Sequence, residues 1–110
     1  CAVAEVPVGI DVEKIRPVSP RLMGILSPQE WESVRCDADF FRLWTLKEAL
    51  IKCRGGVLGQ IRHVHFDLSG SSIICSVPGY SFSLLPAPAG YAAALCWENI
   101  EEATESENQK

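Results

Sequence analysis

The spacing of apolar residues in this 110-residue chain changes from a helical period to a period of two near residue 60. Before that point, apolar side chains recur on one stripe of a helix predicted over residues 38–53, and Gly55-Gly56 supplies its stop. Residues 1–13 are predicted to be extended, with Pro7 and Gly9 marking a bend or bulge between two short strands. Beyond residue 60 the alternation predicts four further strands, over residues 62–68, 72–77, 80–84 and 90–97.

Two shorter helices are expected between the first strands and the long helix. Ser27-Pro28-Gln29-Glu30 predicts a helix start, because serine can cap, proline suits the first position and glutamate can bond back to the cap. That helix would run to about Cys36, and a shorter one is expected over residues 21–26. A strand pair, then helices, then a meander predict an α+β domain, an antiparallel sheet with helices packed on one face. Residues 1–97 are expected to form this domain and residues 98–110 an acidic tail.

Composition narrows the class of protein. With 47% hydrophobic and 22% charged residues, the chain is expected to form one globular domain. No apolar run approaches the roughly 18–20 residues needed to cross a bilayer. Since the first residues lack a basic region followed by an apolar stretch, we expect no secretory signal. Five scattered cysteines without a C-x-x-C pair predict reduced thiols and a cytoplasmic location. Because the chain starts at Cys1 within a strand-like run, we expect upstream sequence to be missing.

The charge is divided along the chain. Its total is −4, but the segment from Lys14 to Arg62 holds nine basic and five acidic residues, a net charge of +4. Such a basic segment can bind phosphate groups or an acidic partner, or it can be an ordinary solvated surface. No nucleic acid or membrane partner is expected.

Three carboxylates and a lysine are candidates for a functional site. Asp11 and Glu13 share one face of a predicted strand, while Glu48 and Lys52 are neighbours one turn apart on the predicted helix. Taken separately, the first pair can face solvent and the second can be a surface ion pair. If the two segments meet, they form an acidic pocket with a cation beside it, which suits a divalent metal ion holding a diphosphate.

The same two segments resemble the signature of the 4′-phosphopantetheinyl transferase superfamily. They read Val8-Gly9-Ile10-Asp11-Val12-Glu13-Lys14 and Leu43-Trp44-Thr45-Leu46-Lys47-Glu48-Ala49-Leu50-Ile51-Lys52. The later run Gly90-Tyr91-Ala92-Ala93-Ala94-Leu95-Cys96 is similar to the closing strand of that family. The chain most resembles the second lobe of the two-lobed, surfactin-synthetase-activating type. The resemblance implies transfer of the phosphopantetheine arm of coenzyme A to a serine of an acyl or peptidyl carrier protein.

The resemblance also implies roles for individual residues. Asp11, Glu13 and Glu48 would hold Mg²⁺, Glu48 would also serve as the base for the serine proton, and Lys52 and Lys47 would contact the phosphates of coenzyme A. The carrier protein would meet a basic and apolar surface made of Arg16, Arg21, Arg35, Leu22, Met23 and Leu26.

Alternatives remain on sequence alone. The chain can be one lobe of a two-lobed enzyme, paired with a missing N-terminal lobe or with a second copy of itself. It can be a single-lobed synthase that works as a homotrimer, or a non-catalytic module that binds a carrier protein or partner subunit. His63 and His65 are compatible with a transition metal, but a plain surface pair is the simpler interpretation.

Overall fold

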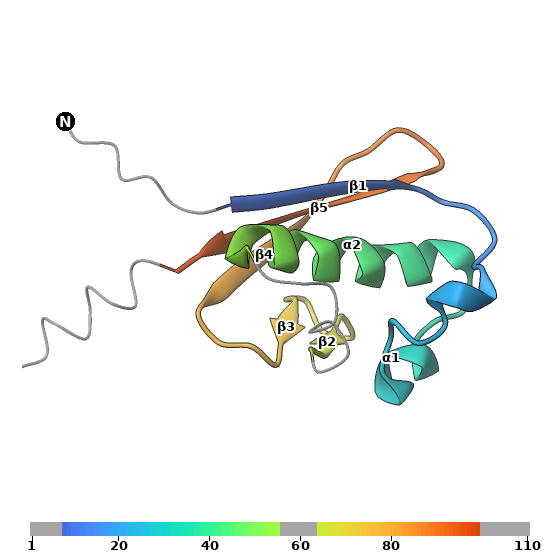
Figure 1. The fold of residues 1–110 in the computed structure, drawn as a ribbon, viewed down its shortest axis with the longest axis horizontal. Helices are drawn as coiled ribbons and strands as arrows, with labels where there is room; N and C mark the ends of the chain where they lie inside the picture. Colours follow the sequence, from blue (N-terminus) through green and yellow to red (C-terminus); the bar gives the residue numbers. More distant parts are fainter. Residues whose placement is uncertain (1–7, 56–63, 100–110) are drawn as a thin grey trace, which may run out of the picture.

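The computed structural model describes residues 8–55 and 64–99 (Figure 1). They confirm the predicted α+β class, with antiparallel strands and helices. The elements in chain order are β1 (Val8–Lys14), the 3₁₀ helix η1 (Pro20–Leu22), α1 (Pro28–Glu32), α2 (Asp37–Arg54), β2 (Phe66–Asp67), β3 (Ile74–Cys75), β4 (Tyr80–Leu85) and β5 (Tyr91–Glu98).

The main sheet has the order β1-β5-β4, and both pairings are antiparallel. The last strand therefore lies between the first strand and its own hairpin partner. Val8 is paired with Trp97 and Lys14 with Tyr91, so the two ends of the described chain meet along one ladder. Strands β2 and β3 form a separate two-stranded sheet.

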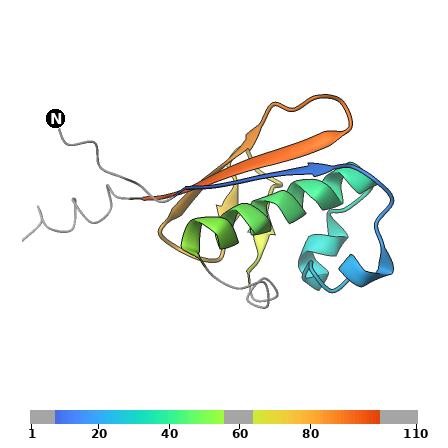
Figure 2. The same cartoon turned by 45° about the horizontal axis from the view of Figure 1, so that its top comes forward.

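Helix α2 lies along one face of the main sheet, against β1 and β5 (Figures 1 and 2). Helix α1 and the β2–β3 pair lie on the side of α2 away from this sheet (Figure 1). Because α2 is covered from both sides, apolar residues from most of its circumference are buried, and they include Phe40, Phe41, Leu43, Leu46, Ala49 and Leu50. The helix thus carries the core, and its few polar side chains must find partners inside it.

Local sequence signals account for most element boundaries. Ser27 and Glu30 form the predicted capping box at the start of α1, which ends at Glu32 rather than near Cys36. Helix α2 matches its predicted range to within a residue at each end, and Gly55 ends it with a φ of 68°. The helix expected over residues 21–26 is the single turn η1. The strands expected over residues 62–68 and 72–77 are shorter, although residues 56–63 lie outside the described parts.

Gly9 does not make the predicted bend or bulge, because β1 runs through it without interruption, and Pro7 lies outside the described residues. The position that a side chain would occupy at Gly9 points toward α2. An added Cβ there would overlap the carbonyl oxygen of Ala49 and lie 2.6 Å from the backbone nitrogen of Cys53. Glycine is therefore required here by the close approach of strand and helix rather than by a turn.

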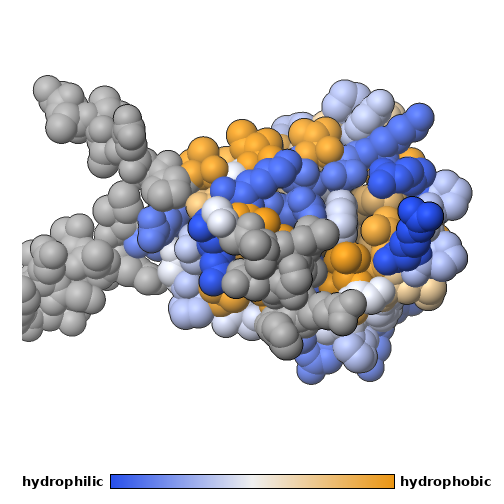
Figure 3. All heavy atoms as spheres, in the orientation of Figure 1, coloured by the Kyte–Doolittle hydropathy of each residue, from blue (hydrophilic) through white to orange (hydrophobic). Residues whose placement is uncertain are grey.

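The other face of the sheet is uncovered by any described element. Val8, Ile10 and Val12 project from β1 onto this face, each about half exposed. Figure 3 shows apolar side chains gathered along its upper rim, where β1 runs in Figure 1. Among the described segments, no helix has the length and apolar character needed to cross a membrane. Cys36, Cys75 and Cys96 are free thiols, as predicted for them.

Candidate active site

Asp11 and Lys52 join β1 to the last turn of α2. The carboxylate of Asp11 faces the helix and is only 4% exposed. Its Oδ1 accepts a hydrogen bond of 2.9 Å from Lys52 Nζ, which also donates to the carbonyl oxygen of Ile10 at 3.2 Å. The bond to Asp11 is the main reason that the pKa of Lys52 is raised, since it favours the charged ammonium. The strand motif and the helix motif therefore meet at this bond, which is the condition on which the predicted acidic pocket depends.

Glu48 lies one helical turn before Lys52 and is half-buried. Its pKa is raised, first by burial and then by the negative charge of Asp11, with a smaller contribution from Glu13. Lys52 partly offsets these effects. The two carboxylates at the centre of the site are thus close enough to repel each other.

Glu13 lies at the far end of the same strand face and is also next to a cation. Arg16 Nη1 is 3.6 Å from its Oε1 and donates a 2.6 Å hydrogen bond to the carbonyl oxygen of Lys14. The guanidinium carbon of Arg16 lies 4.6 Å from the ring centre of Phe41, which adds a cation–π contact. Arg16 was expected only on the carrier-protein surface, although its spacing of three residues from Glu13 could have suggested this ion pair.

The donor set of this site fits Mg²⁺ in its chemistry. Asp11, Glu13 and Glu48 offer hard carboxylate oxygens, and Asp11 Oδ2 is buried without a hydrogen-bond partner. An unsatisfied buried oxygen of this kind calls for a cation or a water molecule. As placed, however, no three acidic, histidine or cysteine side chains of residues 8–55 and 64–99 form a ready-made metal cluster. Asp11 is paired with Lys52, and Glu13 is paired with Arg16.

Lys47 does not join this site, which corrects the expectation that it contacts phosphate. It is buried in the core, where its Nζ lies 2.6 Å from Glu30 Oε1 and donates to the carbonyl oxygens of Ile25 and Val64. Burial lowers the pKa of Lys47, and the partner Glu30 opposes that shift. An ammonium enclosed in this way links the helices to the segment before β2 and is not available to a substrate.

Glu30 was predicted only as a helix cap, but it organises this buried cluster. Its Oε1 accepts from the backbone nitrogen of Ser27, and its Oε2 accepts from that of Phe66 at 2.7 Å. The capping-box motif in the sequence predicted the contact of Glu30 with Ser27. The bond to Phe66 depends on a contact 36 residues away and has no local signature.

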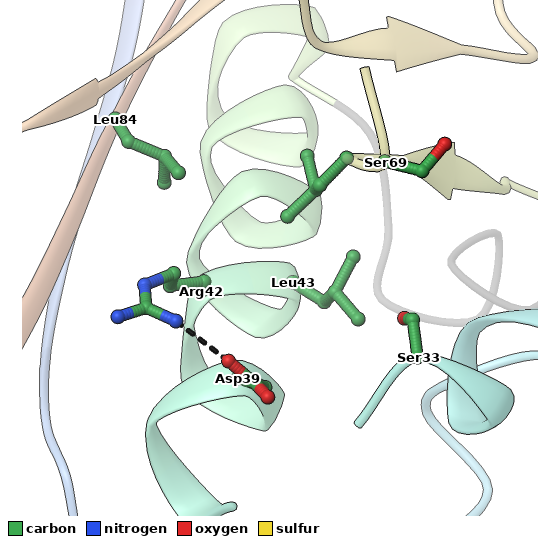
Figure 4. A pocket seen from close by; sticks show the side chains of 7 residues that line it. Ser33, Asp39, Arg42, Leu43, Ser69 and Leu84 are labelled. Atoms are coloured by element: carbon green, nitrogen blue, oxygen red, sulfur yellow. Dashed lines mark hydrogen bonds and ion pairs between the residues drawn. The ribbon is translucent and has the colours of Figure 1, made fainter. Parts of the chain in front are cut away.

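The pocket drawn in Figure 4 is separate from the acidic site. It has a volume of about 400 Å³, and its lining is formed by Ser33, Asp39, Arg42, Leu43, Leu68, Ser69 and Leu84. Asp39 and Arg42 are paired with each other at 2.6 Å, so their opposite charges offset one another in this pocket. We therefore place the chemistry at Asp11, where charged groups are gathered, rather than in this mostly apolar pocket.

The predicted histidine pair is not described as a pair. His63 lies outside the described residues, and His65 directly precedes β2, with its Nδ1 buried and without a hydrogen-bond partner.

Comparison with known proteins identifies the family. Residues 7–96 match the sequence model of the 4′-phosphopantetheinyl transferase superfamily, which includes every described element up to β5. The chain is also similar to a 4′-phosphopantetheinyl transferase, psf-1, from Bacillus pumilus, with 33% identity over 92 residues. This alignment covers 77% of the present chain but only 37% of the relative, so the chain spans little more than a third of that protein. The matched region contains both the strand bearing Asp11 and the helix bearing Glu48 and Lys52, and the chain belongs to the 4′-phosphopantetheinyl transferase superfamily.

Proposed function

We propose that this chain provides a catalytic lobe that transfers the 4′-phosphopantetheine arm of coenzyme A to a serine of an acyl or peptidyl carrier protein. The observation that supports this most is the meeting of Asp11, Glu48 and Lys52 at the seam of β1 and α2. These residues come from the two motifs by which the chain resembles the family, 37 positions or more apart in the sequence.

In the proposed reaction, the serine oxygen forms a bond to the phosphorus that carries the pantetheine arm. The bond from that phosphorus to the bridging oxygen breaks, and adenosine 3′,5′-bisphosphate leaves with the bridging oxygen. Glu48 accepts the serine proton, directly or through a water molecule. Lys52 provides a positive charge for the phosphate oxygens.

Asp11, Glu13 and Glu48 are the residues that would hold Mg²⁺. The bound ion would supply positive charge against the diphosphate of coenzyme A. The buried and unpartnered Oδ2 of Asp11 supports this assignment.

The carrier protein is proposed to meet the surface around η1 and α1. Arg16, Arg21 and Arg35 are exposed there, and Met23 is the most exposed apolar residue beside them. A shallow groove runs from Val18 and Met23 to Arg35. Leu26 was expected to contribute to this surface, but it is buried in the core and cannot do so. Basic residues around an apolar groove suit an acidic amphipathic helix.

A mass measurement tests the proposal directly. The chain is incubated with coenzyme A, Mg²⁺ and an apo carrier protein, and the carrier is examined for the mass gain of one phosphopantetheine arm. A two-lobed transferase of the family serves as the positive control. No gain with a working control favours the second candidate, a non-catalytic lobe, which the coverage of only 37% of the relative keeps open.

Substitution of Glu48 tests the assigned base. Glu48→Gln should lower the transfer rate by about 10²-fold or more, because amide oxygen cannot take the serine proton and binds Mg²⁺ less well. Glu98→Gln, which alters an exposed glutamate at the end of β5, is the matched control and should leave the rate unchanged. A Glu48→Gln enzyme as fast as the unsubstituted chain would contradict both roles.

A further inference from the structure

We infer that Lys52 occupies the place of a divalent cation on Asp11, so that metal binding and the Lys52–Asp11 bond exclude one another. This inference rests on the proposed magnesium site. It assigns Lys52 a role before any phosphate arrives, as an internal competitor that sets the metal affinity of the site.

The two partners of this bond differ in their freedom to leave. Asp11 is buried on the strand, with 4% of its side chain exposed. Lys52 reaches it from the rim, and 50% of the lysine side chain is exposed. The ammonium can therefore return to water at little cost in hydration, whereas the carboxylate cannot. An exchange of partners at Asp11 must proceed by departure of the lysine.

The charges around Asp11 also favour replacement of Lys52 by a divalent ion over binding of that ion beside Lys52. Its Oδ1 is bonded to Lys52, while Oδ2 of the same carboxylate is buried without a partner. Glu48, one helical turn before Lys52, forms no ion pair within the described part of the chain. Asp11 and Glu48 thus share one nearby ammonium and remain short of positive charge. A divalent ion would supply more charge than Lys52 does, at the same oxygens.

A lysine ammonium and a divalent ion on one carboxylate would repel each other. Two such charges about 5 Å apart interact unfavourably, even in water, by an amount that corresponds to roughly tenfold in binding affinity. Metal binding should therefore displace Lys52, and the released ammonium is then free to meet an anionic ligand of the metal. The resulting coupling is reciprocal, since whatever draws Lys52 away from Asp11 must strengthen metal binding.

The test measures Mg²⁺ binding to the chain by isothermal titration calorimetry, without coenzyme A and at a pH well above the carboxylate range. Lys52→Met removes the competitor and should bind Mg²⁺ about tenfold more tightly than the unsubstituted chain. Lys52→Arg keeps a cation that can form two bonds to a carboxylate and should bind no more tightly than the unsubstituted chain. Lys14→Met removes a lysine from the outer face of the same strand and should leave affinity nearly unchanged. Circular dichroism confirms that each variant is folded.

Each outcome separates this inference from the proposed function. If Mg²⁺ binds the unsubstituted chain and Asp11→Asn abolishes binding, the metal site stands; equal or weaker binding by Lys52→Met then overturns the inference alone. An equal gain in Lys14→Met would attribute the effect to overall charge and would also overturn it. If neither the unsubstituted chain nor Lys52→Met binds Mg²⁺, or if Asp11→Asn binds as well as either, both the inference and the metal site are wrong.

Discussion

Lys47 and Lys52 show how two lysines five residues apart on one helix acquire different roles. Lys52 is at the rim, on a carboxylate that belongs to the candidate site, and it can exchange partners. Lys47 is enclosed with Glu30 and two backbone carbonyls, which compensate its charge inside the core. The family motif contains both lysines, but the structure supports a role in the site for Lys52 alone.

Removal of Lys47 should destabilise the fold strongly. Lys47→Met leaves the carboxylate of Glu30 buried without its cation, and we expect a loss of about 3–5 kcal/mol in the free energy of unfolding. The double variant Lys47→Met with Glu30→Gln should lose less, because no unpaired charge is then buried. Urea unfolding followed by tryptophan fluorescence measures both. Equal losses in the single and the double variant would show that the buried charge is not the cause.

The pH dependence of stability should report Glu48. Its pKa in the folded chain is raised above the ordinary value of 4.5, so the folded state holds this proton more firmly than the unfolded state does. The stabilisation from Glu48 is therefore complete below the unfolded pKa and is lost as pH rises through the folded one. Relative to Glu48→Gln, the unsubstituted chain should lose unfolding free energy over that interval. Parallel pH profiles for the two proteins, from urea unfolding, would contradict a raised pKa.

At the scale of the elements, the site depends on how closely β1 approaches α2. Gly9 allows the strand to lie against the backbone of Ala49 and Cys53, two residues before Asp11 and near the turn that carries Lys52. The Asp11–Lys52 bond of 2.9 Å thus depends on a glycine that has no chemical role itself.

Gly9→Ala should separate the two elements. The added methyl group would overlap the helix backbone, which cannot rotate away as a side chain can, so we expect a loss of about 1–3 kcal/mol or more in the free energy of unfolding. Gly70→Ala is the matched control, because nothing lies within 4 Å of the added Cβ there. Urea unfolding of both variants is the measurement. A Gly9→Ala chain as stable as the Gly70→Ala chain would refute the close contact.

At the scale of the whole molecule, the main sheet is covered by α2 on one face only. The strand that bears Asp11 is at the edge of this sheet, and its alternate residues Val8, Ile10 and Val12 are exposed on the other face. An unpaired edge strand with β-branched side chains readily pairs with another chain. An exposed apolar face on an edge strand agrees with the sequence-based expectation of a second copy or a missing N-terminal lobe, which stays a prediction.

Self-association should therefore involve this face. We expect sedimentation velocity to show a concentration-dependent dimer that Ile10→Lys shifts toward monomer, because a lysine there would bring like charges together. Ile74→Lys is the matched control, since Ile74 is 58% exposed and Ile10 51%, but Ile74 lies on the separate two-stranded sheet. A chain that stays monomeric at all concentrations, or equal effects of both substitutions, would contradict this expectation.

Patterns within one segment were sufficient to determine much of this protein. Helical spacing and a glycine stop placed α2, the capping box placed the start of α1, and alternation identified the strands and hence the α+β class. The face shared by Asp11 and Glu13 and the turn shared by Glu48 and Lys52 followed from the same local periods. The predicted boundary between a domain over residues 1–97 and a tail over residues 98–110 stays a prediction, since residues 100–110 lie outside the described parts.

Only the tertiary structure decided which neighbours these side chains have. Asp11 meets Lys52 across 41 positions, Lys47 reaches the carbonyl oxygen of Val64 across 17, and Glu30 accepts from Phe66 across 36. Local spacing cannot specify such contacts, because burial and pairing depend on how separate elements pack. For the same reason the sequence could not show that the acids of β1 face the helix while its valines and isoleucine face outward, an arrangement that follows once Gly9 brings that strand against α2.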